Sequence, residues 1–97
     1  MINIYYLSYC PYSQKALKIL DKYKINHCKI ESSDNKEERK KIYKTFPQIY
    51  WNESLIGGYD NFMSIINSLR TIKEPIQPDE WDNKEWYRFL LHIAKQI

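Results

Sequence analysis

The stretch INIYYLSYCPYS at residues 2–13 decides the fold, because it joins a strand to a helix within one short segment. Its first part, Ile2 to Leu7, is apolar and aromatic and predicts a buried strand. The pattern breaks at residues 8–10. Pro11 then suits the first turn of a helix, where its missing N–H leaves no hydrogen bond unmade. The sequence therefore places Cys10 between a strand and the N-terminus of a helix.

Residues 11–31 complete a strand–helix–strand unit. Apolar residues recur at helical spacing after Pro11 and predict an amphipathic helix over residues 11–24. His27 to Glu31 alternates between two faces and predicts a second strand, with Cys28 facing the core. Two strands joined by a helix form a right-handed crossover, so these strands are expected to be parallel.

The remainder of the chain predicts two more strands and three more helices. Ser33 or Asp34 suits the cap of a helix that runs to about Lys44. After it the pattern predicts a β-hairpin at 48–51 and 55–56 with its turn at 52–54, a helix at 60–71, a linker bounded by Pro75 and Pro78, and a last helix at about 80–96. This order indicates an α/β protein in which helices cover both faces of a mixed sheet.

Composition limits the class of protein further. The 97 residues fit one domain, and a hydrophobic content of 43% suffices for a packed core. The net charge is +3, and Lys residues are interleaved with acidic ones, as in 36–41, which indicates a solvated helix face rather than a nucleic-acid site. No stretch is apolar enough to span a membrane, and Met1 to Leu7 lacks the features of a signal peptide. We expect a cytoplasmic monomer with no nucleic-acid or membrane partner.

The position of Cys10 favours a reactive thiol. A helix N-terminus stabilises an anion, and the thiolate is the nucleophilic form of cysteine. Tyr9 and Tyr12 flank the sulfur, and Lys15 lies about one turn along the helix. Position alone leaves open the role of a buried hydrophobic residue. Together with Cys28, Cys10 does not make a four-ligand zinc site, so no metal is expected.

Ser13 determines which thiol chemistry is open to Cys10. A second cysteine at that spacing would close an internal disulfide, whereas a serine does not attack a mixed disulfide. A glutathionyl group on Cys10 therefore has to be removed by another thiol, most simply free glutathione.

Three segments, in this order, resemble the motifs of the glutaredoxin family: CPYS at 10–13, TFPQIY at 45–50 and LIGGYDNF at 55–62. The resemblance covers residues 2–71. It implies a thioredoxin-like fold with a four-stranded mixed sheet flanked by helices. We expect residues 1–74 to form this core and residues 75–97 to form a C-terminal helical extension that packs on the same domain.

The resemblance also implies a glutathione site. It implies a cis peptide between Phe46 and Pro47, with the Phe46 backbone pairing with glutathione as a short added strand would. Tyr59 and Asp60 follow the two glycines and hold the γ-glutamyl end in the family. Tyr12 matches the tyrosine beside the sulfur.

Three residues depart from the family pattern. Ser13 replaces the second cysteine, and Phe46 replaces the usual valine. Leu7 stands where the family often has a lysine that pairs with the glycyl carboxylate of glutathione. Other cations then have to meet that carboxylate, and the candidates are Lys15, Arg39, Lys41 and Lys44.

These observations predict a glutathione-dependent oxidoreductase that reduces glutathionylated proteins or small disulfides by a monothiol mechanism through Cys10. Two other functions stay open. One is an iron–sulfur cluster carrier that uses glutathione as a ligand. The other is a non-catalytic interaction module that binds a partner through residues 79–97, with Trp81, Trp86 and Tyr87 as anchors.

Overall fold

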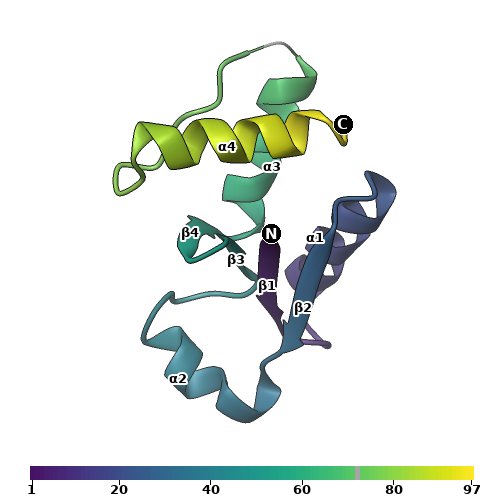
Figure 1. Cartoon of the computed structure of the whole chain (residues 1–97). Coiled ribbons are helices and arrows are strands. Elements are labelled where there is room, and N and C mark those ends of the chain that lie inside the picture. The colour runs from purple at the N-terminus through teal and green to yellow at the C-terminus, as the bar shows by residue number, and fades with distance from the viewer. Residues whose placement is uncertain (72) are drawn as a thin grey trace.

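The computed structural model describes residues 1–71 and 73–97, which form one sheet with helices around it (Figure 1). The strands are β1 (Ile2–Tyr6), β2 (His27–Glu31), β3 (Gln48–Trp51) and β4 (Ser54–Gly57). The α-helices are α1 (Pro11–Lys22), α2 (Lys36–Lys40), α3 (Tyr59–Arg70) and α4 (Asn83–Ala94), and a short 3-10 helix, η1, is Ser33–Asn35.

The strand order is β2-β1-β3-β4, so β1 and β3 are central and β2 and β4 are the edges. β1 and β2 are parallel, as the crossover predicts, and β3 is antiparallel to both β1 and β4. Tyr5 near the end of β1 lies opposite Gln48 at the start of β3. This register brings the segment after β1, which carries Cys10, next to Pro47.

The core lies on the face of the sheet that α1 and α3 cover. Ile2, Ile4 and Ile49 alternate with residues of the opposite face and are fully buried. Two helices supply the apolar residues that pack against them: Ala16 and Leu20 from α1, and Phe62, Ile65 and Ile66 from α3. Burial of these side chains at helical spacing fixes both helices on the sheet.

The predicted helix at residues 33–44 is wrong in its extent, because α2 ends at Lys40. The side-chain amide of Gln48, which is fully buried, donates to the carbonyl oxygens of Arg39 and Tyr43 at 3.0 and 2.7 Å. The Tyr43 carbonyl is thus used by β3 rather than by a further turn of helix. The predicted caps, Ser33 and Asp34, are also wrong, because the N-cap residues of η1 and α2 are Ser32 and Asn35, and neither side chain caps its helix.

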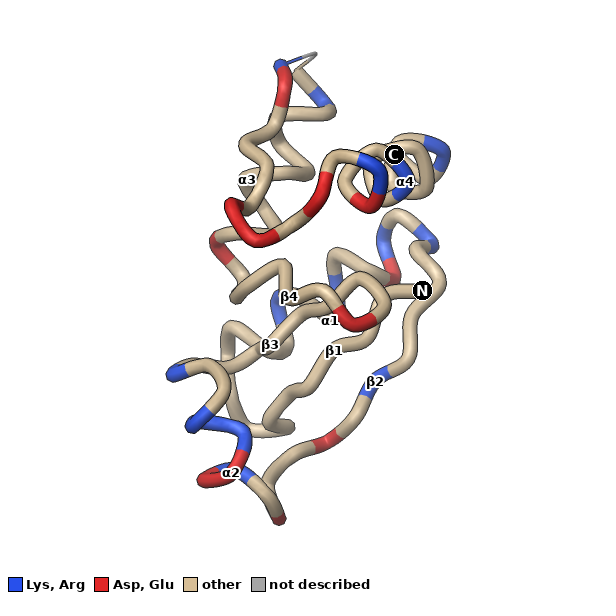
Figure 2. Tube along the Cα trace, turned by 60° about the vertical axis from the view of Figure 1, so that its left-hand side comes forward, with Lys and Arg blue, Asp and Glu red and all other residues tan. Residues whose placement is uncertain are grey.

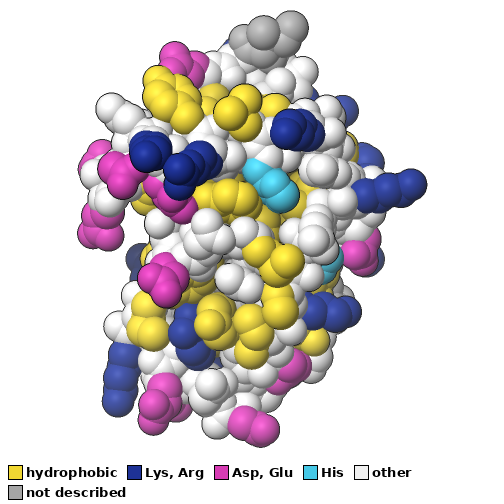
Figure 3. All heavy atoms as spheres, viewed as in Figure 1, with side chains coloured by type: hydrophobic (Ala, Val, Ile, Leu, Met, Phe, Trp, Pro, Cys, Tyr) yellow, Lys and Arg dark blue, Asp and Glu magenta, His cyan; other side chains and the backbone are white. Residues whose placement is uncertain are grey.

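The prediction that Cys28 faces the core is also wrong, because its side chain is exposed. Cys28 lies opposite Asn3 on the edge strand β2, on the face away from Ile2 and Ile4. Helix α2 is too short to reach this part of that face (Figure 1). Hydrophobic side chains therefore remain visible over the sheet between α4 and α2 (Figure 3).

Helix α4 lies near the N-terminus of the chain and passes in front of α3 in the view of Figure 1, while Figure 2 shows the two helices apart. Helix α4 begins after its N-cap Asp82, whose Oδ1 accepts from the Glu85 N–H at 2.7 Å. Trp86, Phe89 and Ile93 belong to the core cluster. Just before the helix, the Trp81 indole N–H donates to the Leu55 carbonyl of β4 at 2.9 Å.

This packing changes how residues 79–97 are interpreted. Of the three aromatic anchors that the sequence suggested for a partner, Trp81 and Trp86 are buried against the rest of the chain, and only Tyr87 is exposed. Their rings contact each other edge to face and both contact Phe89. The two tryptophans therefore stabilise the chain itself.

Charges of both signs lie on α2, as Figure 2 shows, in agreement with a solvated helix face. Within residues 1–71 and 73–97, no helix combines the length and the apolar character that a membrane span requires.

His92 of α4 stacks on Trp51 at the end of β3, with ring centroids 4.8 Å apart. In the described part of the chain, neither His92 Nε2 nor Trp51 Nε1 has a hydrogen-bond partner, although both atoms are buried. Burial lowers the pKa of His92 from its ordinary value of 6.5, and the positive charges of the N-terminus and Lys95 lower it further. The folded state therefore favours the neutral imidazole.

We expect the free energy of unfolding to fall as the pH drops below 6.5, because the unfolded chain then binds a proton that folded His92 resists. Urea unfolding at about pH 5 and about pH 7.5 measures this difference. A His92→Phe variant should lose the part of the pH dependence that arises from this residue. An equal difference in the wild-type chain and the variant would contradict the prediction.

Candidate active site

Cys10 is the N-cap residue of α1, and Pro11 occupies the first turn as the sequence predicts. The Cys10 carbonyl accepts the first helical bond from the Gln14 N–H at 3.0 Å, and its own N–H donates to Leu7. Its side chain is half-buried. Cys10 therefore lies at the end of α1 that carries the unpaired N–H groups and the positive end of the helix dipole.

The Cys10 sulfur lies 3.8 Å from the Phe46 carbonyl oxygen. The Phe46–Pro47 peptide bond is cis, and both residues are buried. The backbone of Phe46 is thus adjacent to the thiol, just before the start of β3.

Ser13 is fully buried, and its hydroxyl oxygen accepts a hydrogen bond from the Leu7 N–H at 3.2 Å. The side chain therefore ties the first turn of α1 to the segment that follows β1. Leu7 itself is buried, so its position offers no contact with a carboxylate in solvent.

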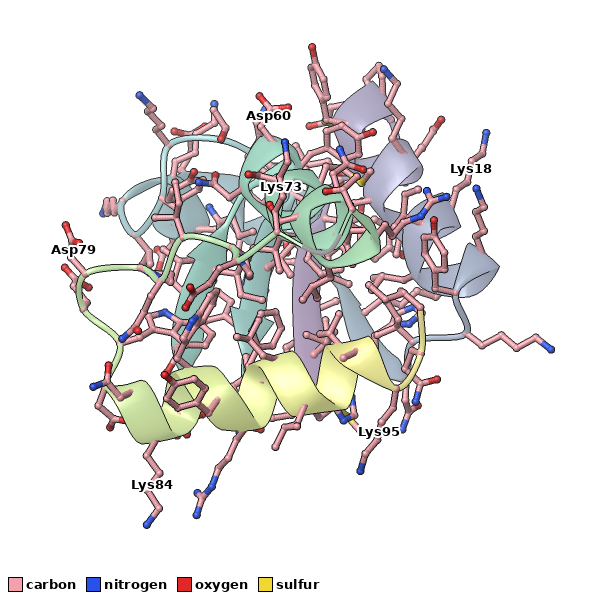
Figure 4. The ribbon with its side chains drawn as sticks, turned by 90° about the horizontal axis from the view of Figure 1, so that it is seen from above. Lys18, Asp60, Lys73, Asp79, Lys84 and Lys95 are labelled. Atoms are coloured by element: carbon pink, nitrogen blue, oxygen red, sulfur yellow. The ribbon has the colours of Figure 1, made fainter. Side chains whose placement is uncertain are left out.

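A groove of about 240 Å³ lies between the loop before β3 and the start of α3. Four of its lining residues were predicted from the sequence to bind glutathione: Tyr12, Phe46, Tyr59 and Asp60. Four others were not: Tyr43, Thr45, Gly58 and Asn61. Figure 4 shows Asp60 on the far side of the strands from Lys84 of α4 and from Lys95 just after it, so the Asp60 end of the groove and α4 lie on opposite sides.

Aromatic rings form the rim of this groove. Tyr12 and Tyr59 lie with ring centroids 5.9 Å apart, which joins the first turn of α1 to the first turn of α3. The Lys15 ammonium lies 5.2 Å above the Tyr12 ring. Of the four predicted cations, Lys15 is therefore beside the groove.

Of the other three predicted cations, Arg39 is engaged with the sheet, whereas Lys44 stands between the groove-lining residues Tyr43 and Thr45. The Arg39 guanidinium stacks 3.5 Å above the Tyr5 ring and donates to Gln48 and Tyr50 at 3.0 and 3.1 Å, so it joins α2 to the sheet. Lys41 and Lys44 are exposed in the segment after α2. Lys36, which the sequence analysis did not single out, lies 5.7 Å over the Tyr9 ring, next to Cys10.

Asn61 shapes the end of the groove. Its Oδ1 accepts from the Gly58 N–H at 3.1 Å and from the Tyr43 hydroxyl at 3.3 Å. The sequence contains one local signal for this role, since Asn61 stands three residues after the N-cap Gly58, where a side chain can bond back to the helix start. The contribution of Tyr43 has no local signal, because it comes from another element.

Another groove, of about 480 Å³, lies at the opposite end of β3, between the β3–β4 turn and the start of α4. Acidic side chains line it and neither cysteine does. Among the described residues no group of three or more His, Cys, Asp or Glu side chains is arranged to hold a metal ion. Cys10 lines neither groove, but its sulfur lies 3.8 Å from the carbonyl of Phe46, which lines the smaller one, so the smaller groove is the one next to the thiol.

A thiol at a helix N-terminus, beside a cis-proline loop on a four-stranded mixed sheet, defines a thiol–disulfide oxidoreductase of thioredoxin-like fold. A family model for glutaredoxin matches residues 2–56. Glutaredoxin 1 of Rickettsia prowazekii is 37% identical over 71 residues, which cover 66% of this chain and 75% of that protein. Glutaredoxin 1 of Rickettsia bellii is 36% identical over 73 residues, with 66% and 74% covered. The chain belongs to the glutaredoxin family.

Solved structures agree on the fold. The buckwheat glutaredoxin–glutathione complex superposes with a TM-score of 0.63 at 20% identity, over 73% of this chain and 72% of that one. Glutaredoxin of Brucella melitensis gives a TM-score of 0.59 at 23% identity, over 79% and 91%. Among sequence relatives, an uncharacterised monothiol glutaredoxin of Caenorhabditis elegans is 32% identical over 73 residues, which cover 66% of this chain and 50% of that protein.

The two glycines before α3 are expected to differ in their tolerance of a side chain. Gly57 has φ +130°, and a Cβ there would lie 2.6 Å from the Asn61 side chain, so Gly57→Ala should destabilise the fold by about 1–3 kcal/mol. Gly58 has φ −95°, and its nearest Cβ contact would be an ordinary 3.6 Å. Gly58→Ala should therefore lower the free energy of unfolding, measured with urea, clearly less than Gly57→Ala does. An equal or larger loss of stability in Gly58→Ala would contradict the prediction.

Proposed function

We propose that this chain reduces glutathione mixed disulfides by a monothiol mechanism in which Cys10 is the nucleophile. The observation that carries the proposal is the position of the Cys10 sulfur, at the N-terminus of α1 and 3.8 Å from the Phe46 carbonyl, beside the tyrosine-rimmed groove. Members of the glutaredoxin family use glutathione, and the groove has the dimensions and polarity of a site for one end of it.

The reaction has two exchange steps. The Cys10 thiolate attacks the glutathione sulfur of a mixed disulfide, a new S–S bond forms on Cys10, and the substrate thiol leaves as a thiolate that takes up a proton from solvent. The thiolate of a second glutathione then attacks the glutathionyl sulfur on Cys10. Glutathione disulfide leaves, and the Cys10 thiolate is regenerated. In sum, one mixed disulfide and one glutathione thiol give one substrate thiol and one glutathione disulfide, whose second half is the glutathionyl group of the substrate.

Ser13 and Cys28 are the reasons for proposing a single-thiol cycle. Ser13 holds no sulfur, and its buried hydroxyl bonds to Leu7. Cys28 lies opposite Asn3, near the start of β1, whereas Cys10 follows the other end of that strand. The three residue-to-residue steps from Asn3 to Tyr6 alone span about 10 Å, which exceeds the Cα separation that a disulfide accepts.

The groove also supports a direction for the bound tripeptide. The N-terminus of α3 at Gly58 offers backbone N–H groups that suit the γ-glutamyl carboxylate, and the Asp60 carboxylate beside it suits the ammonium. Tyr12 would then cover the sulfur-bearing residue, and the glycyl carboxylate would point away from α3. Lys15 and Lys36, which lie over the Tyr12 and Tyr9 rings, are candidates to meet that carboxylate, as is Lys44 between Tyr43 and Thr45.

Replacement of Cys10 by serine should lower turnover of a glutathionylated peptide to the rate of uncatalysed exchange, because serine is not a nucleophile toward disulfides. A glutathione reductase-coupled assay measures this rate. The matched control is Cys28→Ser, which should keep wild-type turnover and, after treatment with glutathione disulfide, should carry one glutathione adduct by mass spectrometry. Turnover that survives in Cys10→Ser, or that is lost in Cys28→Ser, would refute the single-thiol cycle.

Replacement of Asp60 by asparagine should raise the KM for the glutathionylated peptide about tenfold, the loss of one charge-assisted bond of about 1.4 kcal/mol. The kcat should change little, because Asp60 lies at the groove and not at the sulfur. Asp79→Asn removes the same charge from the turn before α4, well apart from Asp60 (Figure 4), and should leave both constants near wild type. If the KM is unchanged in both variants, Asp60 does not bind the substrate.

A further inference from the structure

Glu31, at the end of β2, bonds to two segments that flank the active site. One of its carboxylate oxygens, Oε2, accepts from the Ser8 N–H at 2.8 Å and from the Ser33 hydroxyl at 2.7 Å. The other, Oε1, accepts from the Ser33 N–H at 2.7 Å. Ser8 begins the three residues that lead into Cys10, and Ser33 begins η1, which continues into α2. One carboxylate therefore connects the loop that carries Cys10 to the start of α2.

Other contacts hold the same loop. The Ser8 carbonyl accepts from the Gln14 side-chain amide at 2.8 Å, so both backbone groups of Ser8 are bonded to side chains. The Lys36 ammonium at the start of α2 lies over the Tyr9 ring. Without Glu31, the loop would keep its link to α1 through Gln14 but would lose its hydrogen-bonded link to η1.

The carboxylate stays charged wherever thiol exchange takes place. The backbone N–H groups of Ser33 and Ser8 lower the pKa of Glu31 from 4.5 to about 2. Hydrogen bonds to a charged acceptor are stronger than those between neutral groups. The link is thus permanent over the pH range in which a thiolate forms.

We propose that Glu31 is a positioning residue for exchange at Cys10, which fixes Ser8 and thereby sets where the Cys10 sulfur lies relative to Phe46 and the groove. Glu31 touches neither the sulfur nor the proposed substrate. The inference rests on the proposed function for the identity of the reaction. The contacts with Ser8 and Ser33 do not depend on it.

A positioning role and a charge effect predict opposite results. A carboxylate bonded two residues before Cys10 disfavours a neighbouring thiolate, so loss of its charge alone would speed alkylation of Cys10 at neutral pH. Loss of the loop's anchor instead misplaces the sulfur for attack on a bound disulfide. Turnover would then fall while alkylation by a small reagent, which needs no bound geometry, would not.

The test compares Glu31→Gln with Glu37→Gln. In Glu31→Gln an amide NH₂ replaces one acceptor oxygen, so Ser8 or Ser33 loses a partner. Glu37→Gln removes the same charge from the first turn of α2. We expect kcat/KM for a glutathionylated peptide to fall about tenfold in Glu31→Gln, with iodoacetamide alkylation of Cys10 unchanged or faster. Glu37→Gln should leave kcat/KM near wild type.

Hydrogen exchange supplies a readout that does not depend on glutathione. The Ser8 amide of the wild-type chain should be protected, and its exchange should quicken in Glu31→Gln while the amides of β1 keep their protection. Wild-type kcat/KM in Glu31→Gln, equal losses in both variants, or an unprotected Ser8 amide in the wild-type chain would each overturn the inference. If Glu31→Gln did not fold, the hydrogen-exchange rate of the Ser8 amide in the wild-type chain would still test the anchor, because an unprotected amide would refute it.

The two proposals fail in different ways. A wild-type chain with a protected Ser8 amide but no turnover of glutathionylated peptide would remove the proposed function and leave the anchor in place. If the wild-type chain turns over the peptide and Glu31→Gln has the same kcat/KM, only the positioning role is refuted.

Discussion

One buried amide, the side chain of Gln48, fixes the loop that carries Phe46 relative to the strand–helix joint that carries Cys10. Its NH₂ donates to the carbonyl oxygens of Arg39 and Tyr43, and its oxygen accepts from the Arg39 guanidinium. A buried amide left without these partners would cost about 1–3 kcal/mol, so the three bonds hold together or are lost together. They end α2, shape the loop of residues 41–47 and keep Arg39 on the Tyr5 ring. The position of Phe46 beside Cys10 depends on that loop.

The sequence predicted the parts of the fold that local pattern encodes. The joint at Cys10, the hairpin around residues 52–54 and the helix after Gly58 all follow from apolar periodicity, proline and glycine. The end of α2 was not predictable in this way, because it depends on Gln48, which is distant in sequence from the start of that helix. Cys28 was misplaced because alternation shows which residues share a face, and says nothing of whether a helix covers that face.

The candidate site divides along the same line. The sequence and its resemblance to glutaredoxins pointed to Cys10, Phe46, Tyr59 and Asp60, all of which lie together in the structure. Arg39 was among the suggested cations, but it is bound to Gln48 and Tyr50 and joins α2 to the sheet. Residues that shape the site from elsewhere in the chain were missed: Tyr43, Asn61, Lys36 and Glu31. Apart from the bond of Asn61 to the Gly58 N–H, their roles rest on tertiary contacts, which no local pattern records.

The bond from the Trp81 indole to the Leu55 carbonyl has a consequence for association between chains. β4 is an edge of the sheet, and an edge strand with free backbone groups is a template for pairing with a strand of another molecule. Trp81 occupies one of those groups and places its large ring alongside the strand. The segment before α4 thus acts as a cover that hinders sheet extension and aggregation at this edge, while the β2 edge relies on the charges of Lys29 and Glu31.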